Sequence, residues 1–135
     1  MKLLLDTNVL VYDTIEDSEY HNMAMRIIDT AKELFIPSIV IYEYIWVMLK
    51  LARVSPSFVS LKIREYLEDP RTTCILEPMG ALINALKMLE RGEQNIREIN
   101  DYIILATALH YNLILATFDK KLRRIAIKKG LKVIP

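Results

Sequence analysis

The segment Leu3-Leu4-Leu5-Asp6 sets the expected architecture of the chain. Three consecutive apolar residues that end at an acid are typical of a short strand covered on both faces, as in a parallel sheet. The acid then stands at the carboxyl end of that strand. Because open parallel sheets bind their ligands beyond this edge, Asp6 is predicted to lie where a site would form.

Further short apolar runs alternate with segments of helical pattern along the chain. Residues 8–13 lead into polar residues, after which helices are expected at Tyr20–Lys32, Ile39–Arg53, Pro56–Glu68, Gly80–Glu90, Asn100–His110 and Lys120–Lys129. Strands are expected at Leu34–Ile36, Thr73–Leu76, Leu113–Ala116 and Lys132–Ile134. This alternation indicates an α/β fold with a mainly parallel sheet between helical layers. Since 135 residues is the size of one ordinary domain, residues 1–135 are predicted to form a single domain.

The composition excludes several classes of function. With three glycines and no GxGxxG or Walker pattern, the chain has no glycine-rich loop for a nucleotide cofactor. The single cysteine, Cys74, cannot form an intrachain disulfide, and its apolar neighbours favour a small core residue over a nucleophile. The apolar stretches at the N-terminus and at Ile39–Leu51 are too short for a signal peptide or a membrane span. We expect a cytoplasmic protein without a membrane partner.

The net charge of +1 does not indicate a nucleic-acid partner, but the positive charge is unevenly distributed. Residues 120–132 contain seven Lys and Arg residues and no acid. This segment is either a solvated helix face or a patch that contacts phosphates, and the sequence leaves both interpretations open. In the second case, Lys120, Lys121 and Arg124 are the candidate backbone contacts.

Three further acids are expected near Asp6. Asp119 closely follows the fourth strand, Glu43 lies in the first turns of the helix after the second strand, and Asp101 begins the helix before the fourth. Taken singly, Asp6 is explained as a turn residue, and Asp101 and Asp119 as helix caps; Ser38 is expected to cap the helix that carries Glu43. Glu43 and Asp101 nevertheless have apolar neighbours, among which a carboxylate does not stay ionised without partners.

Four acids in one crevice would repel one another and raise their pKa values. A divalent cation removes that conflict, and Mg²⁺ or Mn²⁺ prefers carboxylate oxygens and water. Such an ion can polarise a phosphodiester and activate water. A zinc site is disfavoured because His21, His110 and Cys74 have no zinc-ligand spacing, and the two histidines are expected to have surface or capping roles.

Three motifs, together with Glu43, resemble the PIN domain family along the whole chain: Leu4-Leu5-Asp6-Thr7-Asn8-Val9-Leu10, Asn100-Asp101 and Thr117-Phe118-Asp119. The compact length is similar to that of stand-alone VapC-type toxins of toxin–antitoxin pairs. The resemblance implies a three-layer α/β/α sandwich and an endoribonuclease, a hydrolase that cuts RNA phosphodiester bonds with Mg²⁺ or Mn²⁺.

The resemblance also implies site residues and partners. It assigns catalysis and metal binding to Asp6, Glu43, Asp101 and Asp119 and a supporting role to Asn8 and Thr117. An RNA substrate, an antitoxin protein and a second copy of the chain are the implied partners. The RNA backbone would lie against Lys120, Lys121 and Arg124.

Tyr102, directly after the third acid, departs from the pattern of many relatives, which have a small residue there. Its ring could pack in the core, narrow the cleft or stack on a base, and core packing is the favoured interpretation. The helix Ile39–Leu51 is apolar on nearly every face, so it is buried by its own core or by a partner, and the latter would give a homodimer.

Two alternative functions stay open. The first is a catalytically silent PIN-like domain that binds RNA or protein. The second is a phosphatase with Asp6 as its nucleophile. It is less favoured because such enzymes generally need a general acid two residues later, and Asn8 cannot transfer a proton.

Overall fold

The computed structural model describes residues 1–92 and 95–135. Within these residues the chain forms five strands: β1 (Lys2–Leu5), β2 (Glu33–Pro37), β3 (Thr72–Ile75), β4 (Ile114–Ala116) and β5 (Val133–Ile134). The α-helices are α1 (Thr7–Thr14), α2 (His21–Thr30), α3 (Ser38–Trp46), α4 (Pro56–Glu68), α5 (Met79–Arg91), α6 (Ile99–Tyr111) and α7 (Lys120–Lys128). A π-helical segment, η1 (Val47–Leu51), continues α3, and a 3₁₀ turn, η2 (Ile96–Glu98), precedes α6.

The five strands form one parallel sheet in the order β3-β2-β1-β4-β5. From β1 the chain builds outward through β2 to β3, and it then returns to the other side of β1 with β4 and β5. The direction therefore reverses between β1 and β4. In sheets of this kind the crevice at such a reversal, beyond the carboxyl ends of the strands, is the usual ligand site.

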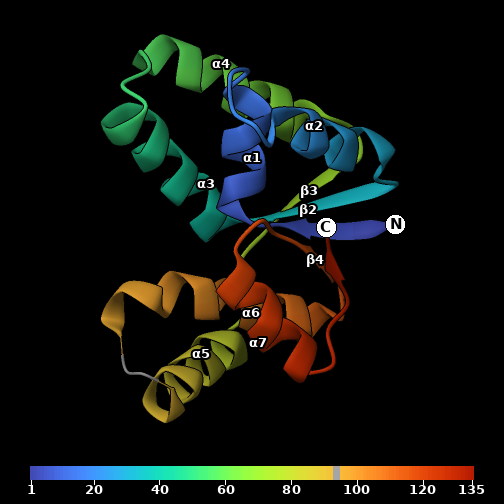
Figure 1. The fold of residues 1–135 in the computed structure, drawn as a ribbon, viewed down its shortest axis with the longest axis vertical. Coiled ribbons are helices and arrows are strands. Elements are labelled where there is room, and N and C mark those ends of the chain that lie inside the picture. The colour runs from blue at the N-terminus through green and yellow to red at the C-terminus, as the bar shows by residue number, and fades with distance from the viewer. Residues whose placement is uncertain (93–94) are drawn as a thin grey trace.

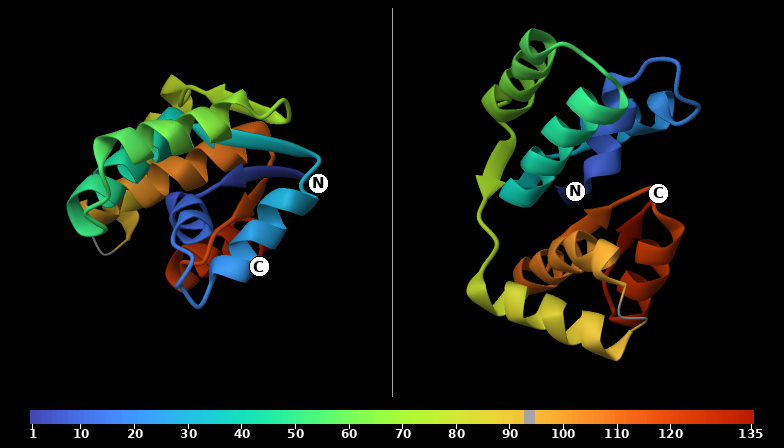
Figure 2. Two further views of the ribbon diagram at one scale, coloured as in Figure 1. Left: turned by 90° about the horizontal axis from the view of Figure 1, so that it is seen from above. Right: turned by 90° about the vertical axis from the view of Figure 1, so that its left-hand side faces the viewer.

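Helices cover both faces of the sheet and give three layers (Figure 1). Helices α1 to α4 lie on one face, and α5, α6 and α7 lie on the other; a second direction of view shows the same separation (Figure 2). This distribution follows from the topology, because every connection on one side of the reversal crosses the same face. The predicted α/β/α sandwich with a parallel central sheet is confirmed.

The core lies on both sides of β1. Leu3, Leu4 and Leu5 have no exposed surface, as expected for a strand between two helical layers. A smaller apolar cluster joins α5 to α6 through Ala81, Ala85, Tyr102 and Ala106. The Tyr102 ring thus packs in the core, which is the favoured one of its three interpretations.

Two local expectations about helices were wrong. Residues 8–13 belong to α1, which begins directly after β1 because the carboxylate of Asp6 caps it. Ser38 does not cap α3: Pro37 precedes the helix, and the Ser38 hydroxyl donates instead to Glu77 at 2.7 Å. The Glu77 carboxylate also accepts the backbone N–H of Ile39 at 2.7 Å, so a residue from the β3–α5 connection caps α3.

The expectation that Cys74 is a core residue was also wrong. Its strand β3 is at the edge of the sheet, and the thiol side is exposed. Its pKa is raised by partial burial and by the nearby charge of Glu77, so the thiol is not an activated nucleophile. Among the described residues, no helix is long and apolar enough to cross a membrane.

Candidate active site

The carboxyl end of β1 places Asp6 at the reversal of the sheet. The backbone N–H of Asp6 donates to Ala116 of β4 at 2.9 Å, which extends the pairing of the two strands. Its side chain is 3% exposed and accepts the backbone N–H of Thr7 at 2.7 Å through Oδ1. Asp6 therefore both ends β1 and caps α1, and its carboxylate has little rotational freedom.

Thr117 joins Asp6 to Asp119. Its hydroxyl, which is buried, donates to Asp6 Oδ2 at 2.7 Å and accepts the backbone N–H of Asp119 at 3.0 Å. One side chain thus fixes the relative positions of two acids that are far apart in the sequence.

Asn8 makes the second link across the reversal. Its Nδ2 donates to Asp6 Oδ2 at 3.0 Å, and its Oδ1 accepts the backbone N–H of Phe118 at 3.1 Å. The Asn8 amide therefore connects the carboxylate of Asp6 to the β4–α7 loop. Both supporting residues expected from the sequence, Asn8 and Thr117, lie against Asp6.

Asp119 is the N-cap of α7. Its Oδ1 accepts the backbone N–H groups of Lys121 and Leu122 at 2.9 and 3.0 Å. The capping interpretation of this residue is thus realised in the structure. It does not exclude a second role, because within the described residues Oδ2 receives no hydrogen bond and stays available to a ligand.

Glu43 reaches the cluster from α3 and is oriented by α6. The side chain of Asn100 donates to Glu43 Oε2 at 3.1 Å. Glu43 and Asn100 also line an open hollow of about 480 Å³ together with the exposed rings of Tyr42 and Trp46. The role of Asn100 was not predicted; its place directly before Asp101 was the only signal in the sequence.

Asp101 lies in the first turn of α6, three residues after the N-cap Glu98, so it is not the cap considered from the sequence. No hydrogen bond to its carboxylate is made by the residues that the structure describes. Burial, and then the charges of Asp6, Asp119, Glu43 and Glu98, raise its pKa to about 7. Burial also raises the pKa of Asp6 to about 6, against the lowering effect of the bonds from Thr117 and Thr7.

The four predicted acids lie close enough together to influence one another's charge, and we refer to them as the acid cluster. Glu43 and Asp119 raise the pKa of Asp6, and all three raise that of Asp101. Glu98 is a fifth acid that was not predicted. It forms an ion pair with Lys121, so one of the three candidate phosphate contacts is already neutralised, whereas Lys120 and Arg124 are exposed on α7.

The donor set suits a hard divalent cation, although its side chains do not form a finished site. Across residues 1–92 and 95–135, no three or more His, Cys, Asp or Glu side chains are arranged as a preformed metal site. The available donors are all oxygens: those of Asp101, Oδ2 of Asp119 and the remaining lone pair of Asp6 Oδ1. Burial and the repulsion between the acids raise two pKa values, and a bound cation would offset both costs.

The two histidines lie outside this cluster. His21 Nδ1 is bonded to the Tyr12 carbonyl oxygen at 2.9 Å, and the exposed ring of His110 packs edge-on against Tyr111. Neither interaction is that of a ligand or a proton-transfer group, in agreement with the surface and capping roles expected.

The fold and the acid cluster define an α/β/α protein with a carboxylate-lined crevice at the reversal of its sheet. A sequence model of the PIN domain matches residues 3–128, and the chain belongs to the PIN domain family. No curated protein matches the chain.

Solved structures of toxins and toxin–antitoxin complexes have the same fold. The sarcin-ricin-loop-cleaving toxin VapC20 of Mycobacterium tuberculosis has a TM-score of 0.77 at 14% identity, over 91% of this chain and 94% of that chain. A DNA-bound VapBC from Salmonella typhimurium has a TM-score of 0.70 at 20% identity, over 98% and 96%. VapBC2 from Rickettsia felis, bound to a promoter DNA fragment, has a TM-score of 0.69 at 21% identity, over 98% and 97%.

Proposed function

We propose that the chain is a Mg²⁺- or Mn²⁺-dependent endoribonuclease that hydrolyses RNA phosphodiester bonds. The observation that carries this proposal is the convergence of Asp6, Glu43, Asp101 and Asp119 at the reversal of the sheet, with the pKa values of two of them raised. Membership of the PIN domain family supports the choice of RNA.

The residues of the site have different proposed roles in the reaction. Asp6, Asp101 and Asp119 would hold the cation, and Glu43 would hold it directly or through water. When bound, the ion supplies Lewis-acid stabilisation of the charge that develops on the phosphate. Asn8 and Thr117 keep Asp6 in place, because each bonds its Oδ2 and also anchors the β4–α7 loop.

Water, rather than a side chain, is the proposed nucleophile. The Thr117 hydroxyl already donates to Asp6 and accepts from Asp119, so it is not free to attack phosphorus. Asn8, two residues after Asp6, is an amide held by two hydrogen bonds, and it offers no proton for the phosphatase alternative.

We further propose that this ribonuclease is the toxin of a VapBC-type pair, inhibited by an antitoxin, in the cytoplasm. The VapC and VapBC structures that share its fold support this assignment. A homodimer is part of the proposal: Tyr42 and Trp46 of α3 are 69% and 55% exposed, and a second copy could cover them. Residues 1–135 are proposed to be one domain.

The direct test is cleavage of a panel of RNAs with Mn²⁺, with and without EDTA. D101N is the most informative variant, because Asp101 accepts no hydrogen bond from the described residues and an amide should leave the fold intact. D6N is a second inactive variant, and D17N, at an exposed acid outside the cluster, is the matched control. Mn²⁺-dependent cleavage by wild type and D17N alone is expected.

Two results would count against the proposal. If D101N and D6N cut RNA as fast as wild type, the carboxylate assignment is wrong. If wild type binds RNA but cuts none of the panel, the silent RNA-binding alternative replaces it. Calorimetric titration with Mn²⁺ then shows whether the carboxylates bind the ion at all.

A further inference from the structure

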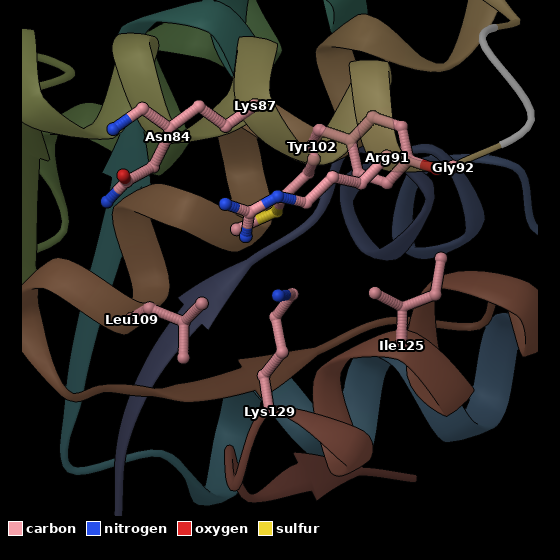
Figure 3. A pocket seen from close by; sticks show the side chains of 9 residues that line it. Asn84, Lys87, Arg91, Gly92, Tyr102, Leu109, Ile125 and Lys129 are labelled. Carbon is pink, nitrogen blue, oxygen red and sulfur yellow. The ribbon is translucent and has the colours of Figure 1, made fainter.

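A second hollow, of about 590 Å³, lies between α5, α6 and α7. Its walls come from α5 and the residue that follows it, from α6, and from α7 and the residue that follows it. Figure 3 shows the side chains of Arg91 and Lys129 extending into the hollow from opposite sides, with Lys87 along the rim beside Asn84. We refer to it as the α5–α7 groove.

Among the described residues, the charged side chains that line the α5–α7 groove are all positive: Lys87, Arg91 and Lys129. None of these three cations forms an ion pair with an acid in the described part of the chain. Lys121 differs, because Glu98 neutralises it. Unpaired cations on facing walls form a site for a negatively charged group.

The floor of the groove is apolar. Met88, Leu109 and Ile125 contribute aliphatic surface, and Tyr102 contributes the edge of a buried ring. The volume is within the range of small-molecule sites, so the groove can accept a nucleotide. Cations above an apolar floor match a nucleotide unit, in which a charged phosphate is joined through ribose to a base with flat, apolar faces.

The groove adjoins the carboxylates. A smaller hollow, of about 50 Å³, is lined by Glu98, Asp101 and Asp119 and shares Tyr102 and Ile125 with the α5–α7 groove. Along α6, the separation of Asp101 from Leu109 corresponds to about 12 Å. A strand of a few nucleotides can span that distance, so one RNA molecule could occupy both places.

We propose that the α5–α7 groove binds the phosphate backbone of the RNA strand beside the bond that is cut, with a phosphate between Arg91 and Lys129. The proposal rests on the proposed function. An RNA strand bound at the carboxylates extends beyond the bond that is cut, and the groove lies beside the carboxylates. The position of the groove therefore favours RNA over an acidic polypeptide as its occupant.

The test measures binding of a fluorescein-labelled 12-nucleotide single-stranded RNA in Mg²⁺ by anisotropy. D101N is the parent, so that the RNA stays uncut. R91A/K129A in that parent is expected to weaken binding about tenfold at 0.1 M salt and to reduce the slope of log K against log salt by about 1.4, since each lost phosphate contact in a single strand contributes about 0.7.

The matched control is R26A/K32A, which removes one Arg and one Lys from exposed positions outside the groove and gives the same net charge. It is expected to leave the affinity within about twofold. A trinucleotide that covers only the carboxylates should bind R91A/K129A and the parent equally. Equal weakening by both double variants would overturn the proposal in favour of a general charge effect.

Further results distinguish the failure of this proposal from the failure of the proposed ribonuclease function. In the wild-type background, R91A/K129A should raise KM for the 12-nucleotide RNA and leave kcat unchanged; no change in KM overturns the groove but not the ribonuclease. Wild type that cuts no RNA with Mn²⁺ overturns the ribonuclease assignment itself, whereas a D101N parent that still cuts the RNA overturns the role of Asp101. Groove-dependent binding of a polyglutamate peptide, with no groove-dependent binding of RNA, would identify an acidic polypeptide as the occupant and overturn the proposal.

Discussion

The acid cluster has two halves that are held in different ways. Asp6 and Asp119 follow strands, and Asn8, Thr117 and the starts of two helices give them five of their hydrogen bonds. Glu43 and Asp101 are carried by helices. Glu43 accepts one bond, from Asn100, and Asp101 accepts none from the described residues. We call Asp6 and Asp119 the strand half of the cluster, and Glu43 and Asp101 the helix half. We infer that the strand half fixes the position of the site, whereas the helix half is held less rigidly and is more sensitive to the charge of the site.

The largest effect should come from removing the charge of Asp101. D101N is expected to lower the rate of RNA cleavage at least about 1000-fold, which is about 4 kcal/mol of transition-state stabilisation. The same variant should unfold at a higher temperature than wild type at pH 8 without metal, because it removes a charge whose pKa the folded state raises to about 7. Lower cleavage with lower stability would contradict the division into two halves.

Thr117 tests the strand half. T117V keeps the shape of the side chain but removes the bond to Asp6 and leaves the Asp119 N–H without its acceptor. We expect a loss of about 1–3 kcal/mol in the free energy of unfolding and a loss of cleavage of about 10- to 100-fold. T107V is the control, since the Thr107 hydroxyl is also buried and, among the described residues, bonds only the Ile103 carbonyl of its own helix.

The stability of the metal-free protein should depend on pH. Asp6 and Asp101 have pKa values of about 6 and about 7 when folded, against the ordinary aspartate value of 3.8, so the folded state binds more protons between about pH 4 and pH 7. Stability should therefore fall as pH rises through this window, by several kcal/mol in total, since each pKa unit corresponds to about 1.4 kcal/mol. Urea unfolding at pH 5 and pH 8 measures it, and saturating Mn²⁺ should remove most of the difference.

The smallest effect should come from Asn100. N100A removes the hydrogen bond from the Asn100 side chain to Glu43 and is expected to cost about 1 kcal/mol, or about fivefold, in the affinity for Mn²⁺ or in cleavage. N22A, at an exposed asparagine on α2, is the control. A loss as large as that of T117V would show that Glu43 belongs to the rigid half.

The strand half was also the more predictable from sequence. Asp6 and Asp119 follow apolar runs, and parallel strands bring their carboxyl ends to one edge, so their meeting could be derived before the fold was known. The bond from Phe118 to Asn8 could not, because it depends on β4 pairing with β1. Helix α1 was missed because Asp6, assigned to the end of a strand, is also the cap that begins it.

Errors elsewhere have equally local causes. Cys74 has the apolar neighbours of a core residue, but a sequence does not show that its strand lies at the edge of the sheet. Glu98 and Lys121 come from the turn before α6 and from α7, and their pairing needed the tertiary structure. The exposed rings of α3 show the same limit: an all-apolar helix predicts burial, and it does not predict what buries it.

The exposed thiol on β3 also provides a natural attachment point for a fluorescent probe. Because Cys74 is the only cysteine, a maleimide dye attaches at one defined place without any substitution. Its raised pKa means that labelling should be done above neutral pH, where more of the thiolate is present. Energy transfer between donor- and acceptor-labelled chains would then show, at working concentrations, whether two copies associate.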